Sequence, residues 1–323
     1  MPQPDDARWL AAAARLAARG RPLSRPNPAV GAILVQDGHV IGRGWTEAGG
    51  RPHAEAVALT QAGPLASGAT LYATLEPCAH PSPRGPSCAD LIAGAGLARL
   101  VYAQTDPDPR TAGKGAARIE TAGVAVERLA SAAAERSLAG YLTRAALGRP
   151  HVTLKLAMSL DGRIALPDGT SRWITREAAR AHVHAQRARS DAILVGGGTW
   201  RTDAPRLDVR LPGLADRSPR RLVLTRGTVP EGVTALGASE EIGALADVQY
   251  LYVEGGAQTA AAFLAADLVD RLDLYRAPVV IGEGRAGVGD IGLADLAQAH
   301  GRWTLVEQRR LGSDIYEAYE RQR

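Results

Sequence analysis

"HAE" at residues 53–55 and "TLEPCAHPSPRGPSC" at residues 74–88 are the two stretches that decide the fold. The second stretch contains both cysteines of the chain, and nine residues separate them. A histidine two residues before a glutamate is common on solvated helices, so "HAE" by itself is weak evidence. Imidazole and thiolate groups together are, however, the ligands that zinc prefers in proteins. The combination therefore indicates a metal site.

The residue types assign different roles within such a site. Zinc with three protein ligands keeps a fourth position open for water, and His53, Cys78 and Cys88 supply three ligands. A carboxylate that is not a ligand can then move protons, which is the role expected of Glu55. Cys88 opens an expected helix, whose dipole favours the thiolate form.

Two alternatives remain for the cysteines. Both could be buried, inert thiols, although the exposed-looking loop "PSPRGPS" is a poor place for burying one. The metal could instead be held with Cys78 and His80, leaving Cys88 idle. The position of Cys88 at a helix start favours the set His53, Cys78 and Cys88.

The surrounding sequence predicts alternating strands and helices, which is typical of a layered α/β sheet. Asp37-Gly38 lies between two apolar runs and predicts a hairpin. An amphipathic first helix would bury one face, made of Trp9, Leu10, Ala13, Leu16 and Ala17. The other expected elements are strands at 31–35, 40–45, 69–76 and 98–104, helices at 54–62, 88–96 and 131–147, and a further helix and strand in 115–129.

A second α/β region starts after Gly148-Arg149-Pro150, so we expect two domains, residues 1–148 and 149–323. The expected elements of the second are strands at 151–157, 192–195, 221–225, 249–254 and 271–277, helices near 175–188 and 259–265, and two final strands joined by Gly312-Ser313-Asp314.

Charge and hydropathy limit the classes of molecule that this protein is expected to bind. The net charge is +4 with an isoelectric point near 9.3, but no basic block appears, which weighs against a nucleic-acid surface. Scattered arginines suit a phosphorylated small molecule. No apolar run is long enough to cross a membrane, and Asp5 and Asp6 argue against a leader peptide. We therefore expect a cytoplasmic protein without membrane or nucleic-acid partners.

Glycine-rich turns follow two strands of the second region, in "AILVGGGT" and "YLYVEGGAQTAAAF". Backbone amides of such turns, and the helix start after the second, suit the phosphates of a dinucleotide. The spacing is not a Rossmann fingerprint. Lys155 could donate near a reacting sugar or belong to a structural ion pair.

Several motifs together resemble the bifunctional deaminase/reductase family of riboflavin biosynthesis. They are "PNPAVGAILV", "HAEAVAL", "TLEPCAH" and "CADLI" in the first region, and "KLAMSLDGRIA", "SRWIT", "GGGTWRTDAPRLDVR" and "VEGGAQTAAAFL" in the second. The resemblance implies a cytidine-deaminase-like three-layer domain followed by a domain similar to dihydrofolate reductase. It also makes the wide cysteine spacing typical of the family.

The same resemblance implies cofactors and site residues. Zn²⁺ and NADPH are the expected cofactors, and Asn27 is the expected substrate contact of the first domain. Arg187 and Arg210 would act as forks for the substrate's phosphate. The implied NADPH contacts are Ala157, Trp173, Thr199, Asp203, Gly256, Ala257, Gln258, Thr259, Ala260, Ala261 and Ala262, and the other implied substrate contacts are Ser171, Leu207 and Glu254.

The implied function is zinc-dependent deamination of a pyrimidine ribosyl phosphate, followed by NADPH-dependent reduction of its ribosyl group to ribityl. The resemblance further implies a homodimer formed through the reductase domain. Three alternatives are a nucleoside or tRNA deaminase with an appended domain, a deaminase whose reductase domain is impaired, and a zinc-stabilised binding or regulatory protein. The first predicts Cys-x-x-Cys and a basic face, and the sequence has neither.

Overall fold

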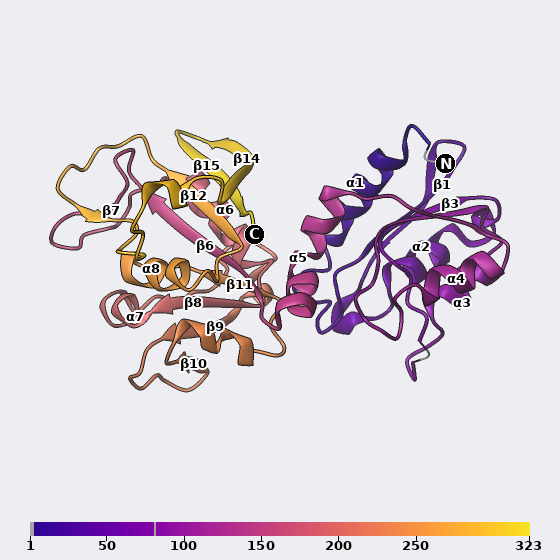
Figure 1. Cartoon of the computed structure of the whole chain (residues 1–323), viewed down its shortest axis with the longest axis horizontal. Helices are drawn as coiled ribbons and strands as arrows, with labels where there is room; N and C mark the ends of the chain where they lie inside the picture. Colours follow the sequence, from indigo (N-terminus) through magenta and orange to yellow (C-terminus); the bar gives the residue numbers. More distant parts are fainter. Residues whose placement is uncertain (1–2, 81) are drawn as a thin grey trace. The chain divides into compact units, whose positions relative to one another are not determined.

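The structure is a computed structural model that describes residues 3–80 and 82–323 (Figure 1). The chain divides into two compact units, Met1–Gly148 and Arg149–Arg323. Gly148 ends the last helix of the first unit in the left-handed conformation, at φ 67°. Glycine is favoured at such a helix end because it has no Cβ to clash.

The first unit contains a five-stranded sheet with the order β2-β1-β3-β4-β5. β1 is antiparallel to both β2 and β3, whereas β3, β4 and β5 are parallel, so the predicted hairpin at Asp37-Gly38 is confirmed. The elements are α1 (Asp6–Ala17), β1 (Gly31–Gln36), β2 (His39–Trp45), α2 (Ala54–Ala62), β3 (Thr70–Leu75), α3 (Cys88–Gly94), β4 (Arg99–Gln104), α4 (Lys114–Thr121), β5 (Ala125–Arg128) and α5 (Ala132–Leu147).

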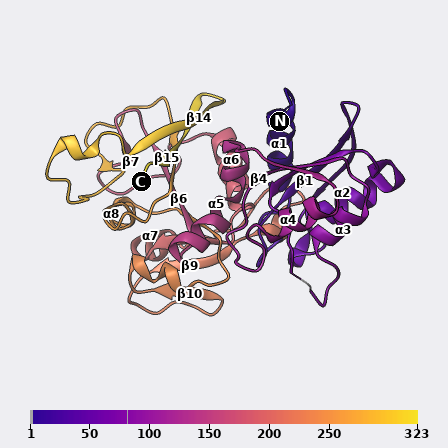
Figure 2. The same cartoon turned by 45° about the vertical axis from the view of Figure 1, so that its right-hand side comes forward.

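Helices cover both faces of this sheet, which gives the expected three layers. Figures 1 and 2 show α1 and α5 on one side of the strands and α2, α3 and α4 on the other. On the α1 side, Trp9 and Leu10 pack against Ile33 and Val101. On the opposite side the core is largely alanine, leucine and isoleucine, as the scarcity of aromatic residues requires.

The expected buried face of α1 is confirmed except at one position. Trp9, Leu10, Ala13 and Ala17 are buried, but Leu16 is only partly buried at the edge of the cluster. Asp6, in the first turn, is fully buried and accepts hydrogen bonds from Arg99 and from the Tyr72 hydroxyl. A charged pair therefore ties α1 to the sheet, a contact that apolar periodicity does not reveal.

Helix α2 lies unusually close to strand β2 because β2 presents glycine there. A Cβ added at Gly44 would approach the carbonyl oxygen of Ala54 and lie 2.7 Å from Cβ of Val57 and 2.9 Å from the backbone nitrogen of Ala58. Real Cβ atoms do not tolerate such contacts. The absence of a side chain at residue 44 thus sets the position of the helix that follows His53.

We expect Gly44→Ala to lower the free energy of unfolding by about 1–3 kcal/mol, because overpacking forces the backbone of α2 away from the sheet. Gly94→Ala is the matched control, since nothing lies within 4 Å of its added Cβ. Urea denaturation of both variants measures the difference. Equal midpoints for the two variants would show that α2 can move without cost.

The second unit contains an eight-stranded sheet with the order β10-β9-β8-β11-β6-β12-β15-β14. The six strands from β10 to β12 in this order are parallel to one another. β15 is antiparallel to both of its neighbours, β12 and β14. The elements are β6 (His151–Met158), β7 (Arg163–Ala165), α6 (Glu177–Arg187), β8 (Ala192–Gly196), α7 (Gly197–Asp203), β9 (Arg220–Leu224), β10 (Val233–Leu236), β11 (Tyr250–Val253), α8 (Ala257–Ala265), β12 (Arg271–Arg276), β13 (Arg285–Ala286), β14 (Trp303–Leu311) and β15 (Asp314–Arg321).

Helices α6 and α8 pack on different clusters of this sheet. Ala179 and Val183 of α6 join the cluster of Tyr252, Tyr275 and Tyr316, whereas α8 contributes Ala260 and Phe263 to the other cluster. All the strands and helices predicted for this region are present within a few residues of their expected bounds. The short strands β7, β10 and β13 and the short helix α7 were not predicted.

No helix in residues 3–80 and 82–323 is both long and apolar enough to cross a membrane.

Candidate active sites

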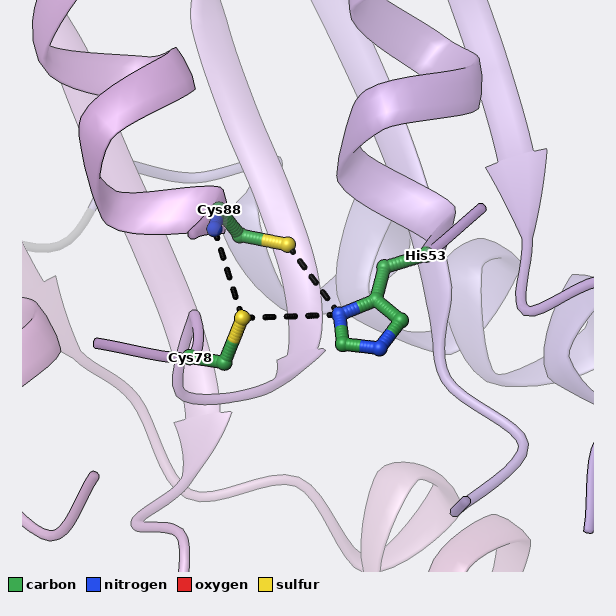
Figure 3. Close-up of side chains that lie close together, drawn as sticks. All are labelled: His53, Cys78 and Cys88. Atoms are coloured by element: carbon green, nitrogen blue, oxygen red, sulfur yellow. Dashed lines mark hydrogen bonds between the residues drawn. The ribbon is translucent and has the colours of Figure 1, made fainter. Parts of the chain in front are cut away.

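His53, Cys78 and Cys88 converge in the first unit, as Figure 3 shows. Nδ1 of His53 lies 3.3 Å from Sγ of Cys88 and 3.5 Å from Sγ of Cys78. The three candidate ligand atoms all lie within 4.8 Å of one another. His53 directly precedes α2, Cys78 follows the end of β3, and Cys88 is the first residue of α3. The donor set of one imidazole and two thiols fits a zinc ion with an open fourth position.

Both cysteines are buried, although Pro83, Arg84 and Pro86 of the loop between them are exposed. Cys78 is 6% exposed and Cys88 is 1% exposed. This loop was expected to be a poor place for burying a thiol, which was wrong, because both thiols are buried at the two ends of the loop. The case against inert thiols rests instead on their contact with His53.

The dipole of α3 was expected to favour the thiolate of Cys88, and this stays a prediction; the contacts among the described residues favour a thiolate at Cys78. The hydrogen bond from the Cys88 thiol, with further help from the Cys88 backbone N–H and His53, lowers the pKa of Cys78 to about 4 despite burial. The pKa of Cys88 is raised, because its thiol donates a hydrogen bond to Cys78 and is buried. The first N–H of α3 points at the sulfur of Cys78, at 3.3 Å, so the helix start stabilises the other cysteine.

Glu55 lies in the first turn of α2 and is 3% exposed. Its Oε2 is buried and has no hydrogen-bond partner among the described residues. Burial raises the pKa of Glu55, which suits a group that accepts and returns a proton near neutral pH. An unpaired buried carboxylate oxygen beside three metal-binding side chains is the feature that a hydrolytic metal site requires.

His80 lies away from this cluster of ligands. Its Nδ1 contacts Oγ1 of Thr111 at 3.3 Å, and the group of metal-binding side chains found among the described residues does not include it. The arrangement in which His80 replaces Cys88 is therefore not supported.

A cavity of about 480 Å³ opens onto the site. Asn27 lies in its wall, with Nδ2 2.9 Å from the carbonyl oxygen of Gly50 and 3.1 Å from Nε2 of His53. Asn27 thus touches the ring nitrogen that faces away from the sulfurs. Sequence reasoning missed other residues of the wall, which include Glu76, Asp106, Arg110 and Tyr141. Glu76 and Asp106 follow the parallel strands β3 and β4, and the rule that ligands bind at the carboxyl ends of parallel strands could have identified them.

In the second unit, Arg187 and Lys155 converge on Glu254. Nε and Nη2 of Arg187 lie 2.6 and 2.9 Å from the two carboxylate oxygens, and Nζ of Lys155 lies 3.7 Å from Oε2. Nη1 of Arg187 also donates to the carbonyl oxygen of Asp208. The fork of Arg187 therefore holds Glu254 rather than standing free for a phosphate. Lys155 belongs to an ion pair, which was one of its two expected roles.

Arg210 and Leu207 differ in what they can offer a substrate. The side chain of Arg210 is 55% exposed, and its Nε lies 3.4 Å from Nε2 of the buried His184. Leu207 is 3% exposed and packs in the core beside Val183, so only its backbone could reach a substrate. Ser171 is exposed.

The two glycine-rich turns lie side by side because β8 and β11 are parallel neighbours. A Cβ added at Gly256 would lie 3.9 Å from Oγ1 of Thr199, and one added at Gly196 would clash with Thr259. Ala260, however, is fully buried in the core and Ala261 is nearly so. The side chain of Ala260 belongs to the core, and Ala261 lies beside Gly289, so the more open part of the expected contact stretch is Gly256, Ala257, Gln258 and Ala262.

The remaining expected cofactor contacts are less closely grouped. Trp173 is 66% exposed, and the Arg180 guanidinium lies 4.9 Å from the centre of its ring. Asp203 ends α7, and Ala157 lies on β6. Thr225 was missed: a Cβ at Gly197 would lie 3.0 Å from its Oγ1, which places this hydroxyl at the first glycine turn. Its position directly after strand β9 could have identified Thr225 as a candidate site residue.

Comparison with known proteins gives two family matches. Residues 3–104 match the cytidine and deoxycytidylate deaminase zinc-binding region, and residues 150–242 and 240–316 match the RibD C-terminal domain. Riboflavin biosynthesis protein RibD of Escherichia coli is 37% identical and covers 96% of this chain and 98% of its own length. RibD of Mycobacterium tuberculosis is 39% identical, with 90% of both chains covered.

Solved structures agree. Acinetobacter baumannii RibD superposes with a TM-score of 0.86 at 34% identity over 99% of both chains. A diaminohydroxyphosphoribosylaminopyrimidine deaminase/5-amino-6-(5-phosphoribosylamino)uracil reductase from Thermotoga maritima gives 0.85 at 28% identity, covering 98% of this chain and 99% of that one.

Proposed function

This chain belongs to the RibD family of riboflavin biosynthesis proteins, and on that premise we propose which residues of each unit perform the two reactions of a deaminase and a reductase. Unit 1, residues 1–148, deaminates diaminohydroxyphosphoribosylaminopyrimidine. Unit 2, residues 149–323, reduces the ribosyl group of the product to ribityl with NADPH. The observation that carries the deaminase assignment is the convergence of His53, Cys78 and Cys88 beside the unpaired Oε2 of Glu55.

In unit 1, His53, Cys78 and Cys88 would hold the zinc ion, and Asn27 would fix the imidazole ring through its outer nitrogen. When bound, zinc would act as a Lewis acid that makes water nucleophilic near neutral pH. Glu55 takes the proton from the attacking water and returns it to the departing amino group, which leaves as ammonia. Oε2 has no hydrogen-bond partner among the described residues, which keeps this oxygen available for both transfers.

In unit 2, NADPH supplies the hydride. The start of α8 and the neighbouring turn at Gly196 offer backbone N–H groups to the cofactor's phosphates, with Thr199 beside them. Trp173, Asp203 and Ala157 are further proposed cofactor contacts. Arg187, Lys155 and Glu254 form one charged group at the proposed substrate position, with Arg210, Ser171 and the backbone of Leu207 as additional substrate contacts.

Ammonia release from the diaminopyrimidine substrate by zinc-loaded protein tests the deaminase assignment. The rate should fall after chelation and return when zinc is added back. Protein that retains zinc and releases no ammonia would contradict the proposal.

Glu254 gives a prediction with a pH dependence. Burial alone would raise the pKa of Glu254, but Lys155 and Arg187 lower it to about 2. Ionised Glu254 therefore stabilises the fold above its ordinary pKa of 4.5, and this contribution is lost as the pH falls towards about 2. Glu254→Gln should lower the free energy of unfolding of unit 2 by about 3 kcal/mol at neutral pH, because two partly buried cations lose their charged partner.

Denaturation of the full chain, followed through amide exchange in β6 and β11, measures this effect. The gap between wild type and Glu254→Gln should narrow steadily below about pH 4. Glu283→Gln, at an exposed residue of the same unit, is the control. A gap that stays constant with pH would show that the loss does not arise from the charge of Glu254.

Unit 2 would also pair as a homodimer in the cytoplasm. The outer edge of its sheet at β14 supports pairing, because an edge strand has unpaired backbone groups. We expect light scattering to give a molar mass twice that of the chain. A molar mass of one chain at high protein concentration would contradict the proposed dimer.

A further inference from the structure

The two cysteines of the metal centre lie on separate segments: Cys78 follows β3, and Cys88 begins α3. Contacts between distant parts of the chain set the distance between them. The backbone N–H of Cys88 donates to Sγ of Cys78 at 3.3 Å, and that of Ala89 donates to the carbonyl oxygen of Cys78 at 3.1 Å. A short Cys-x-x-Cys turn would fix both sulfurs through its own backbone. With nine intervening residues, the geometry depends on whatever holds the start of α3 against the end of β3.

Arg118 of α4 contacts both segments. Its Nη1 lies 3.0 Å from the carbonyl oxygen of Ala79, the residue after Cys78. The same atom lies 3.3 Å from Oγ of Ser87, the residue before Cys88, and 2.9 Å from Oδ1 of Asp90. Ser87 caps α3 by accepting from the Asp90 N–H, so this guanidinium group joins the turn of one cysteine to the helix start of the other.

Helix α4 is itself anchored at the same strand end. Its N-cap, Gly113, has no capping side chain, and Glu76 replaces one: Oε2 accepts from the Gly113 N–H at 3.1 Å, and Oε1 accepts from the Ala116 N–H at 3.2 Å. Glu76 is 2% exposed and lies two residues before Cys78. A Cβ at Gly115 would clash with the carbonyl oxygen of Pro77, so α4 packs directly on the backbone that leads to Cys78. Arg118 is thus carried by a rigidly placed helix.

We propose that Arg118 is a positioning residue of the metal centre, which fixes the separation of the Cys78 and Cys88 segments through Ala79, Ser87 and Asp90. This inference rests on the proposed zinc-dependent function. It explains how a wide cysteine spacing retains a compact ligand set. Arg118 touches no ligand atom and does not line the cavity among the described residues, so its effect should appear in metal retention.

Transfer of zinc from the full-length protein to the chelator pyridylazoresorcinol tests the proposal. Arg118→Met retains much of the apolar stem but loses all three contacts, and we expect zinc release about tenfold faster than from wild type, as for other residues that orient metal ligands. Arg118→Lys should lie between the two because it keeps one cationic donor. Arg136→Met, at an exposed arginine of α5, is the matched control and should release zinc at the wild-type rate.

Two measurements on the zinc-free protein separate positioning from a general loss of stability. Hydrogen exchange at the Ala89 amide should be faster in Arg118→Met, whereas the melting temperature should match that of Arg136→Met. Equal zinc-release rates in Arg118→Met and Arg136→Met overturn the inference, as does a fall in melting temperature without any change at Ala89. Wild-type protein that holds no zinc overturns the proposed function itself.

Discussion

Replacing Glu55 with glutamine should abolish deamination while zinc remains bound. Oε2 of Glu55 is buried, has no partner among the described residues and lies beside the three metal-binding side chains. Glutamine has nearly the same shape but cannot accept and return a proton, and general acid–base groups contribute about 10²–10⁴ in rate. We expect a loss of that size in ammonia release, with metal content measured by atomic absorption unchanged.

The control uses another glutamate of the same unit. Glu120 is exposed on α4, so Glu120→Gln should release ammonia at the wild-type rate. Both variants should reduce the deaminated intermediate normally when it is supplied with NADPH. Glu55→Gln protein that loses its zinc would make Glu55 a ligand, and Glu55→Gln protein with nearly full activity would place the proton transfer on another residue.

Replacing Cys88 with alanine should remove the zinc, whereas replacing His80 with alanine should not. Sγ of Cys88 lies 3.3 Å from Nδ1 of His53, but His80 contacts Thr111 instead. Loss of a direct ligand should weaken zinc binding by more than the roughly 10–100-fold seen when a residue that merely orients a ligand is lost. Competition with a chelator measures the affinity of each variant.

Alanine is well tolerated in helices, so Cys88→Ala should keep α3 and the fold of unit 1. Far-ultraviolet circular dichroism of the zinc-free proteins checks that point, and NADPH oxidation reports on unit 2. If His80→Ala loses zinc and Cys88→Ala retains it, the alternative ligand set is correct.

Much of the architecture could be predicted from the sequence because local signals agree with tertiary packing. Asp37-Gly38 marks a hairpin, Gly63-Pro64 ends α2, and Gly148 ends α5 near the boundary between the compact units. The residue types of the metal centre were also readable, since two cysteines and "HAE" leave few chemical interpretations. These features depend on neighbouring residues or on composition.

The rest depends on locally ambiguous segments or on contacts between residues far apart in the sequence. α7 was missed because Gly197 and Gly198 favour a turn over a helix, although the structure continues them into one. The pKa of Cys78 is lowered chiefly by a hydrogen bond from the Cys88 thiol, with the Cys88 N–H as a further donor, and no spacing rule shows either contact. Leu207 was expected to contact the substrate and Ala260 to contact NADPH, but the side chains of both belong to the core.

A coupled assay with mass detection tests most directly whether one chain performs both reactions. Zinc-loaded protein is incubated with the diaminopyrimidine ribosyl phosphate, with and without NADPH. We expect the deaminated compound alone when NADPH is absent, and its ribityl derivative when NADPH is present. Accumulation of the deaminated compound in the presence of NADPH would contradict the account of unit 2, and unchanged substrate in both reactions would contradict the account of unit 1.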